Sequence, residues 1–142
     1  MRIADVLRGK GTEVVSVERD TSVWQLLALL AEHNIGAVVV RDGDAVAGIV
    51  SERDIVRRLQ SGGVDILAGP VSAIMTELVV TCAPEDSVDS LTAIMTERRV
   101  RHLPVMVDGR LAGIVSIGDV VKSRVAQLEQ DREQLESYIA QG

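Results

Sequence analysis

Apolar residues follow two patterns along the first half of the chain. Residues 23–30 carry apolar side chains at helical spacing, and the polar segment 20–22 before them offers an N-cap. Residues 35–40 form a continuous, largely β-branched run, which is typical of a strand covered on both faces. Asp42-Gly43 predicts a tight turn into a second apolar strand over 45–50. The pattern therefore predicts a helix followed by a β-hairpin.

The same order of elements begins again 65 residues later. Residues 71–75 match an opening helical turn at 3–7, and a second Asp-Gly turn at Asp108-Gly109 separates two further apolar runs. Aligning residues 14–59 with 79–124 gives 15 identities in 46 pairs, and these include Gly, Ser and Asp as well as apolar residues. Shared hydrophobicity alone does not explain such matches, so the chain is a tandem repeat.

Each repeat reads as a β-α-β-β-α unit, with first strands expected over 14–17 and 79–82. This order predicts an α/β fold with small mixed sheets and helices against one face of each. A single copy buries little surface, so two copies should pack about a pseudo-twofold axis, with equivalent residues lining any cleft between them. We expect a first repeat over residues 1–66, a second over 67–124 and a helical extension over 125–142.

The C-terminal segment 116–140 predicts one long helix, because it contains neither Gly nor Pro after Gly118. Its apolar residues follow a heptad-like spacing, and Arg132 stands where one more would complete it; they are Val121, Val125, Leu128, Leu135 and Ile139. Two interpretations stay open: a helix that packs on its own domain, and a helix that holds two copies together.

Composition excludes several classes of protein. The formal charge of −6 disfavours nucleic acid as a partner. One cysteine, Cys82, permits no internal disulfide and gives no zinc-ligand spacing, which fits a reducing compartment. The start of the chain lacks the apolar core of a signal peptide, and no apolar run is long enough to cross a bilayer. We therefore expect a cytoplasmic protein with no membrane partner.

The string Gly-Ile-Val-Ser-x-x-Asp occurs in both repeats, at 48–54 and 113–119. A Ser followed three residues later by an acid is also a capping box, which closes the first turn of a helix without any ligand. Capping boxes favour Glu or Gln, however, and here the acid is Asp both times, at one place in each repeat. The sequence leaves both a cap and a ligand site open.

The chain resembles a tandem pair of CBS domains, also called a Bateman module, over nearly its whole length. The resemblance rests on the two Gly-Ile-Val-Ser-x-x-Asp strings, on Arg101-His102-Leu103-Pro104-Val105 and on Ile74-Met75-Thr76. It implies that an adenine nucleotide or a related adenosyl compound binds in the cleft between the repeats. By this resemblance Asp54 and Asp119 take ribose hydroxyls, and Ser51 and Ser116 lie beside the ribose or phosphate.

The two copies differ where phosphate would bind. Arg53 in the first string is replaced by Gly118 in the second, whereas Arg101-His102 stands where the first repeat has Gly36-Ala37. Two equivalent sites and one good site with one altered or empty site are both open. The candidate nucleotide-binding residues are Ser51, Arg53, Asp54, Thr81, Arg101, His102, Pro104, Ser116 and Asp119. Apolar walls for the adenine are expected from Val14-Val15, Val38-Val39 and Val79-Val80.

These features favour a regulatory sensor without catalysis of its own. The expected ligand is AMP, ADP or ATP, with an adenine dinucleotide such as NAD(H), or S-adenosylmethionine, as the second choice. We also expect a homodimer and a regulated protein on another chain. An enzyme is disfavoured, because no nucleophile with its base and no Gly-rich dinucleotide fingerprint is present, and Lys10 lacks P-loop spacing. A purely structural interaction module, in which the motif is only a cap, stays the alternative.

Overall fold

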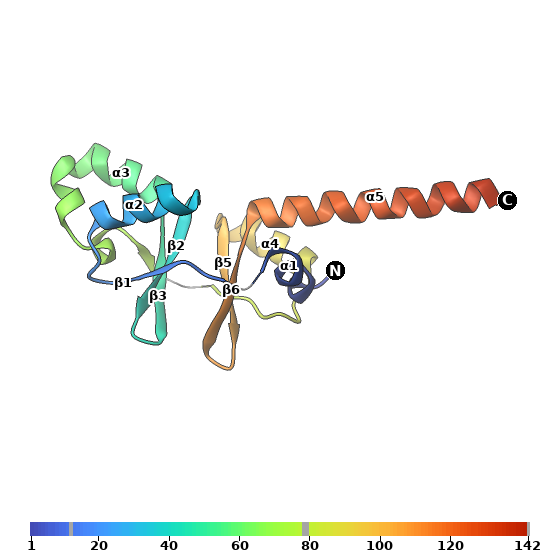
Figure 1. The fold of residues 1–142 in the computed structure, drawn as a ribbon, viewed down its shortest axis with the longest axis horizontal. Coiled ribbons are helices and arrows are strands. Elements are labelled where there is room, and N and C mark those ends of the chain that lie inside the picture. The colour runs from blue at the N-terminus through green and yellow to red at the C-terminus, as the bar shows by residue number, and fades with distance from the viewer. Residues whose placement is uncertain (12, 78–79, 142) are drawn as a thin grey trace.

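The computed structural model describes residues 1–11, 13–77 and 80–141 (Figure 1). It has two β-containing halves side by side and a long C-terminal helix that projects away from them. The elements in chain order are α1 (Ile3–Lys10), β1 (Ser16–Glu18), α2 (Val23–His33), β2 (Ala37–Asp42), β3 (Ala45–Ser51), α3 (Glu52–Gly62), the 3-10 turns η1 (Val64–Ala68) and η2 (Val71–Ala73), β4 (Thr76–Glu77), α4 (Val88–Arg98), β5 (His102–Val107), β6 (Arg110–Ser116) and α5 (Ile117–Gln141). The predicted fold class is confirmed.

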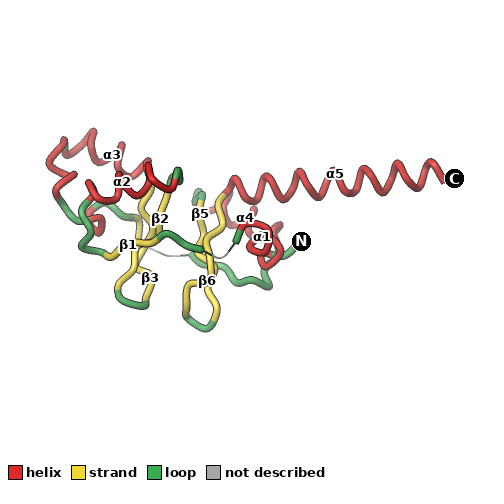
Figure 2. The backbone as a smooth tube through the Cα atoms, viewed as in Figure 1, coloured by secondary structure: helices red, strands yellow, loops and turns green. Residues whose placement is uncertain are grey.

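The first half is a four-stranded mixed sheet in the order β1-β2-β3-β4, with α2 and α3 together on one side of it (Figures 1 and 2). β1 runs parallel to β2, and the other two pairings are antiparallel. The side chain of Ser22 caps α2 by accepting from the Gln25 amide, and Asn34 ends the helix in a left-handed conformation with φ 52°. The predicted helix and hairpin are therefore confirmed.

The second half contains only the β5–β6 hairpin, so the strand expected over 79–82 is wrong where the structure describes it. Val79 lies outside the described residues. Cys82 forms an isolated parallel bridge with Val105. The reason lies in Pro104: in the first repeat the Val39 amide donates to the Val15 carbonyl at 3.4 Å, whereas Pro104 at the equivalent place has no N–H to donate. The ladder therefore cannot extend along β5.

Two separate apolar cores hold the halves, and each includes the opening turn of the other repeat. Ile3 and Leu7 of α1 pack with the core of α4, β5 and β6, whereas Val71 and Ile74 pack with the core of α2, β2 and β3. Backbone hydrogen bonds fix both exchanges: the Ile3 amide donates to the Asp86 carbonyl and the Val71 amide to the Thr21 carbonyl. Each repeat therefore contributes its opening helical turn to the apolar core of the other repeat.

The repeated glycine of the motif marks the place where these exchanged segments cross the hairpins. A Cβ atom at Gly48 would overlap the carbonyl oxygen of Thr76 in β4, which pairs with β3 at this point. At Gly113 a Cβ atom would lie 2.7 Å from Cδ2 of Leu7 in α1. Glycine is thus needed at both positions for close approach of a neighbouring segment.

Candidate functional site

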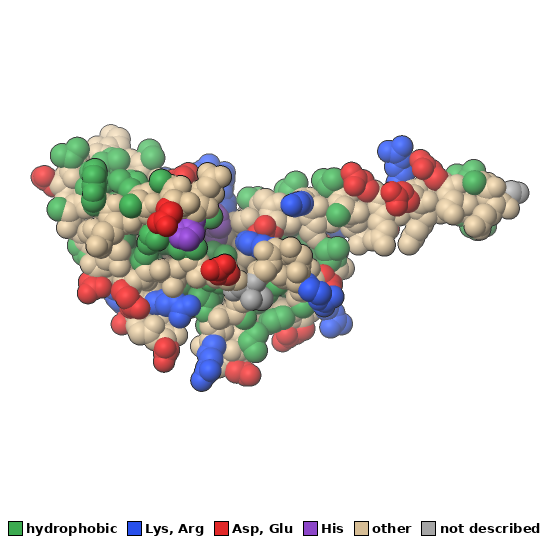
Figure 3. All heavy atoms as spheres, viewed as in Figure 1, with side chains coloured by type: hydrophobic (Ala, Val, Ile, Leu, Met, Phe, Trp, Pro, Cys, Tyr) green, Lys and Arg blue, Asp and Glu red, His purple; other side chains and the backbone are tan. Residues whose placement is uncertain are grey.

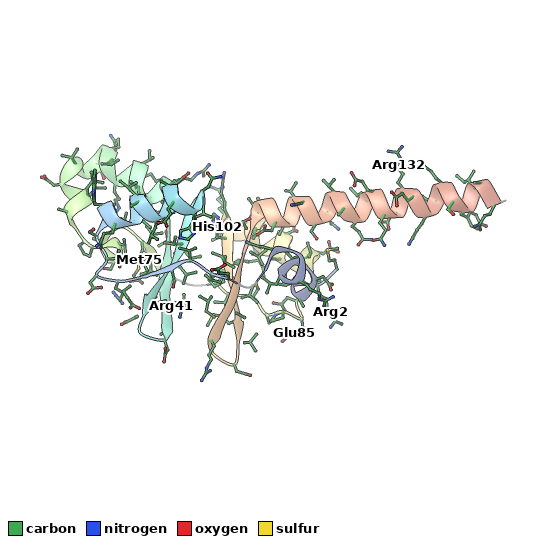
Figure 4. All side chains as sticks on the ribbon, viewed as in Figure 1. Arg2, Arg41, Met75, Glu85, His102 and Arg132 are labelled. Atoms are coloured by element: carbon green, nitrogen blue, oxygen red, sulfur yellow. The ribbon has the colours of Figure 1, made fainter. Side chains whose placement is uncertain are left out.

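A cavity of about 380 Å³ opens between the two repeats, where the first turn of α3 faces the start of β5. The motif of the first repeat supplies Ser51, Arg53 and Asp54, and the second repeat supplies Arg101 and His102. Figure 4 shows His102 at the start of β5, on the side that faces the first repeat. The structure therefore brings five of the nine candidate residues to one cavity.

Asp54 serves as a helix cap and lines the cavity at once. Its Oδ2 accepts hydrogen bonds from the Ser51 amide at 2.9 Å and the Ser51 hydroxyl at 3.0 Å, and the Asp54 amide donates back to Ser51 Oγ at 3.4 Å. Its second oxygen, Oδ1, accepts only a long bond of 3.4 Å from Thr76 Oγ1 among the described residues. The cap thus occupies one carboxylate oxygen and leaves acceptor capacity on the other.

Four arginines line this cavity, and two of them were not among the sequence candidates. Arg57 follows Arg53 by one helical turn of α3, and Arg99 ends α4 with a left-handed φ of 55°. None of these four guanidinium groups forms an ion pair with another described residue. The i, i+4 spacing of Arg53 and Arg57 could have indicated Arg57 as a further cavity residue. Arg99 carries no such signal, since its place depends on where α4 ends.

The remaining walls are acidic or apolar. Glu52 and Glu77 add negative charge, and the apolar lining comes from Ile49, Val80, Val100 and Leu103. Of the valines expected to flank an adenine, Val80 lies in this lining, whereas Val38 and Val39 are buried in the interior of the first half. Val79 belongs to the part of the chain that the structure does not describe. The cavity therefore combines an apolar surface with separate anionic and cationic groups.

His102 is half-buried between charged groups of both signs. Burial is the main reason that its pKa lies below the usual value of 6.5, and the positive charges of Lys10 and Arg101 lower the pKa further, while Asp119 opposes them. A neutral imidazole at neutral pH can accept or donate one hydrogen bond at each nitrogen. Protonation at lower pH would add a positive charge to the cavity wall.

The second motif carries an ion pair, and its residues are not among those that line the cavity described above. Asp119 Oδ2 accepts from the Ser116 amide at 2.9 Å and from Lys10 Nζ at 2.5 Å, and the same ammonium donates to the Ile114 carbonyl at 2.8 Å. Burial works against ionisation of Asp119, but the hydrogen bonds from Lys10 and Ser116 outweigh it, so its pKa lies below the ordinary value. Lys10 thus bonds the same oxygen of Asp119 that accepts the cap bond, whereas Thr76 bonds the other oxygen of Asp54, Oδ1.

Four candidates lie away from the cavity. Ser116 and Asp119 form the cap of α5, Thr81 is exposed, and Pro104 is buried in β5, where its carbonyl accepts from the Cys82 amide. Cys82 itself is buried, and burial together with Asp86 raises its pKa to about 12. Across residues 1–11, 13–77 and 80–141, no cluster of His, Cys, Asp and Glu is arranged to hold a metal ion. None of the helices described is long and apolar enough to cross a membrane.

Comparison with known proteins identifies the family. The CBS domain model matches residues 4–61 and 71–126, so the chain belongs to the CBS domain family and is a CBS domain pair, a regulatory module. It is 36% identical over 149 residues to "CBS domain-containing protein CBSX3, mitochondrial" of Arabidopsis thaliana, covering 99% of this chain and 72% of that one. The predicted family is thereby confirmed.

Solved structures agree on the fold. The CBS-domain containing protein ATU1752 of Agrobacterium tumefaciens is 46% identical, with a TM-score of 0.84 over 87% of this chain and 99% of that one. The CBS domain pair of protein MJ0100, solved in complex with methylthioadenosine and S-adenosyl-L-methionine, has a TM-score of 0.79 at 22% identity, over 89% of this chain and 98% of that one. At that identity the second likeness establishes the shared fold.

Proposed function

We propose that the protein is a sensor that binds one adenine nucleotide per chain in the cavity between its repeats and has no catalytic activity of its own. One observation carries the proposal: Asp54 of the first repeat and Arg101 of the second line the same cavity, with Arg53, Arg57 and Arg99 around them. A carboxylate that accepts from vicinal hydroxyls and guanidinium groups that donate to phosphate are what a nucleotide requires.

In this proposal Asp54 Oδ1 accepts from the ribose hydroxyls, and the bond from Thr76 Oγ1 gives way. The Glu52 amide donates to the Gly36 carbonyl and the Asp54 amide to Ser51 Oγ, so the first turn of α3 offers the phosphates the Arg53 amide and a positive dipole end, next to the arginine side chains. The adenine lies against Val80, Val100 and Leu103. Each charge-assisted hydrogen bond contributes about 1.5–3 kcal/mol, so loss of one contact lowers affinity roughly tenfold or more.

Charge and volume favour AMP, ADP or ATP among the adenosyl ligands. Four arginines attract phosphate and disfavour the sulfonium cation of S-adenosylmethionine, even though MJ0100 carries that compound. A volume of about 380 Å³ lies at the small end of the range for ligand pockets, roughly 300–1,000 Å³, which favours a mononucleotide over a dinucleotide such as NAD(H).

A thermal-unfolding panel tests the proposal. A ligand that binds only the folded state stabilises it by RT ln(1 + [L]/Kd), or about 2.7 kcal/mol at one hundred times Kd. We expect AMP, ADP or ATP to raise Tm more than NAD(H) or S-adenosylmethionine does. A flat response to all five compounds at millimolar concentration would contradict the proposal and favour a structural module whose motif is only a cap.

The regulated partner is another protein chain, and we infer a homodimer as the assembly that presents this site. A purely structural module would have the same two helix caps. The ligand and the dimer are therefore tested by separate experiments. A cytoplasmic location stays a prediction from the sequence.

A further inference from the structure

The helix α5 is much longer than its contact with the domain. Its 25 residues span about 37 Å at 1.5 Å per residue. Val120 is buried at its start and Arg124 pairs with Asp89 of α4 at 2.7 Å, but every residue from 128 to 141 is exposed. Figure 1 shows this part projecting from the domain, and Figure 3 shows its side chains uncovered on the face in view. A free helical segment of that length is marginal in water, so a packing partner would stabilise it.

One side of α5 carries an apolar heptad stripe that is interrupted once, at Arg132. Val121, Val125, Leu128, Leu135 and Ile139 follow 4-3-7-4 spacing, and each is 49% to 72% exposed. Arg132 fills the gap in the stripe and bonds Glu136 of its own helix at 3.1 Å (Figure 4). Of the side chains that contact the domain, Val120 and Ser123 lie on another side of the helix, and Arg124 flanks the stripe. Such a stripe is the seam of a two-helix coiled coil.

We propose that α5 pairs with α5 of a second copy of this chain, antiparallel, with Val125 of one copy opposite Leu135 of the other. In this register every core residue of one helix meets a core residue of the other over nearly the full helix. Val121 meets Ile139 of the second copy, and Leu128 meets the aliphatic stem of Arg132.

The charge of Arg132 within the stripe selects this direction. In the antiparallel register Lys122 lies against Glu136 of the second copy, and Arg132 lies beside Glu129. In a parallel pair Arg132 would face its own copy in the core, which is a like-charge contact. The flanks of a parallel pair would hold one repulsive contact, Asp131 against Glu136, and one attractive contact, Arg124 against Glu129. In the antiparallel pair the like-charge contacts lie at the centre, where Glu129 meets Glu129 of the second copy and Asp131 meets Asp131. The two Arg132 side chains place positive charge beside them.

This inference deepens the dimer in the proposed function but rests on no nucleotide contact. The antiparallel arrangement places the two domains at opposite ends of a rod of about 37 Å. The nucleotide cavity lies within each chain. If the helices do not pair, the nucleotide titration is unchanged, and if no nucleotide binds, the helix pairing is unchanged.

Disulfide trapping of the full chain tests the register. Val125→Cys and Leu135→Cys variants are purified separately, one with a size tag, and are oxidised alone and mixed. The antiparallel pair predicts a cross-linked heterodimer in the mixture and little cross-link in either variant alone. The native Cys82 is buried and should stay unreactive. Oxidation of the wild-type chain, which should give no cross-link, is the control. Self-cross-linking of Val125→Cys, or no cross-link in the mixture, would overturn the proposal.

Sedimentation of full-length variants provides the second readout. Leu128→Glu should shift the chain to monomer, whereas Trp24→Glu, at an equally exposed position outside α5, should leave the dimer intact. Lys122→Glu and Glu136→Lys should each weaken the dimer, and the double reversal should restore it. A monomeric wild-type chain at the highest concentration studied, or a dimer that survives Leu128→Glu, would overturn the proposal.

Discussion

Lys10 Nζ lies 2.5 Å from Asp119 Oδ2, so the second copy of the motif is closed by an ammonium group from the N-terminal helix. The first copy has no such ammonium partner among the described residues: beyond the bonds from Ser51, Asp54 accepts only from the neutral hydroxyl of Thr76, at 3.4 Å. The difference comes from length, because α1 runs on through Lys10, whereas the matching turn η2 ends at Ala73 and the chain continues as β4. One additional turn of helix therefore separates a closed copy from an open one.

Removing the ammonium should destabilise the fold in a pH-dependent way. We expect Lys10→Met to lower the free energy of unfolding by about 1 kcal/mol at pH 7, since the pair is part-exposed. Because the pKa of Asp119 is lowered in the folded state, this stability is present above its ordinary value of 3.8 and is lost as pH falls through the lowered pKa. Urea unfolding at pH 7 and at pH 3 measures it. An equal loss at both values would indicate that only the packing of the lysine stem matters.

The two motif glycines should differ in their tolerance of a methyl group. Gly48→Ala forces Cβ onto the backbone carbonyl of Thr76, which cannot move without breaking the β3–β4 pairing, so we expect a loss of about 1–3 kcal/mol. Gly113→Ala meets the end of the Leu7 side chain, which can rotate, so its cost should be smaller. Chemical denaturation of both variants makes the comparison. A larger cost at Gly113 would contradict this packing.

Much of the local structure could be predicted from the sequence, because strong periodicity and Asp-Gly turns determine it locally. Both hairpins, the N-cap within residues 20–22 and the long C-terminal helix are examples. The exchange of opening turns could not, since Ile3 and Val71 fit either apolar core equally well by composition. The lysine beside Asp119 could not either, because it comes from a helix more than one hundred residues earlier in the chain.

The residues that line the cavity could likewise be predicted only in part from the sequence. The motif indicated Asp54 and the resemblance indicated Arg101, but only the folded chain places Arg57 and Arg99 beside them. Pairing within the sheet was also hidden, because Pro84 and Pro104 lack the N–H groups with which Arg19 and Val39 donate at the equivalent places of the first repeat.

The arginines that line the cavity should bind the phosphates of the nucleotide. We expect Arg57→Ala to weaken ATP binding about tenfold and adenosine binding little, because the lost interaction is a charge-assisted hydrogen bond to phosphate. Arg110→Ala, an exposed arginine at the start of β6, serves as the matched control for net charge. Calorimetric titration of both variants measures the effect. Equal losses in the two variants would mean that Arg57 acts only through the overall field of the protein.

His102 should make both stability and binding depend on pH. Its pKa is lowered in the folded chain, so folding stability is highest above the unfolded value of 6.5 and falls as pH drops below it. Nucleotide affinity should change in the opposite sense and rise over the same window, because the protonated ring adds a positive charge near the phosphates. His102→Gln should flatten both profiles. A wild-type affinity that is constant from pH 8 to pH 5 would contradict this role.

The central claim is that Asp54 binds ribose in a single site per chain, and calorimetric titration of Asp54→Glu with AMP and ATP tests it most directly. Glu serves a capping box at least as well as Asp, so the helix should stay capped while the longer side chain crowds the ribose. Asp5→Glu, in the capping box of α1 and away from the cavity, is the control. We predict one nucleotide per wild-type chain, unchanged binding by Asp5→Glu, and at least a tenfold loss for Asp54→Glu at unchanged Tm. Wild-type affinity in Asp54→Glu would contradict the account.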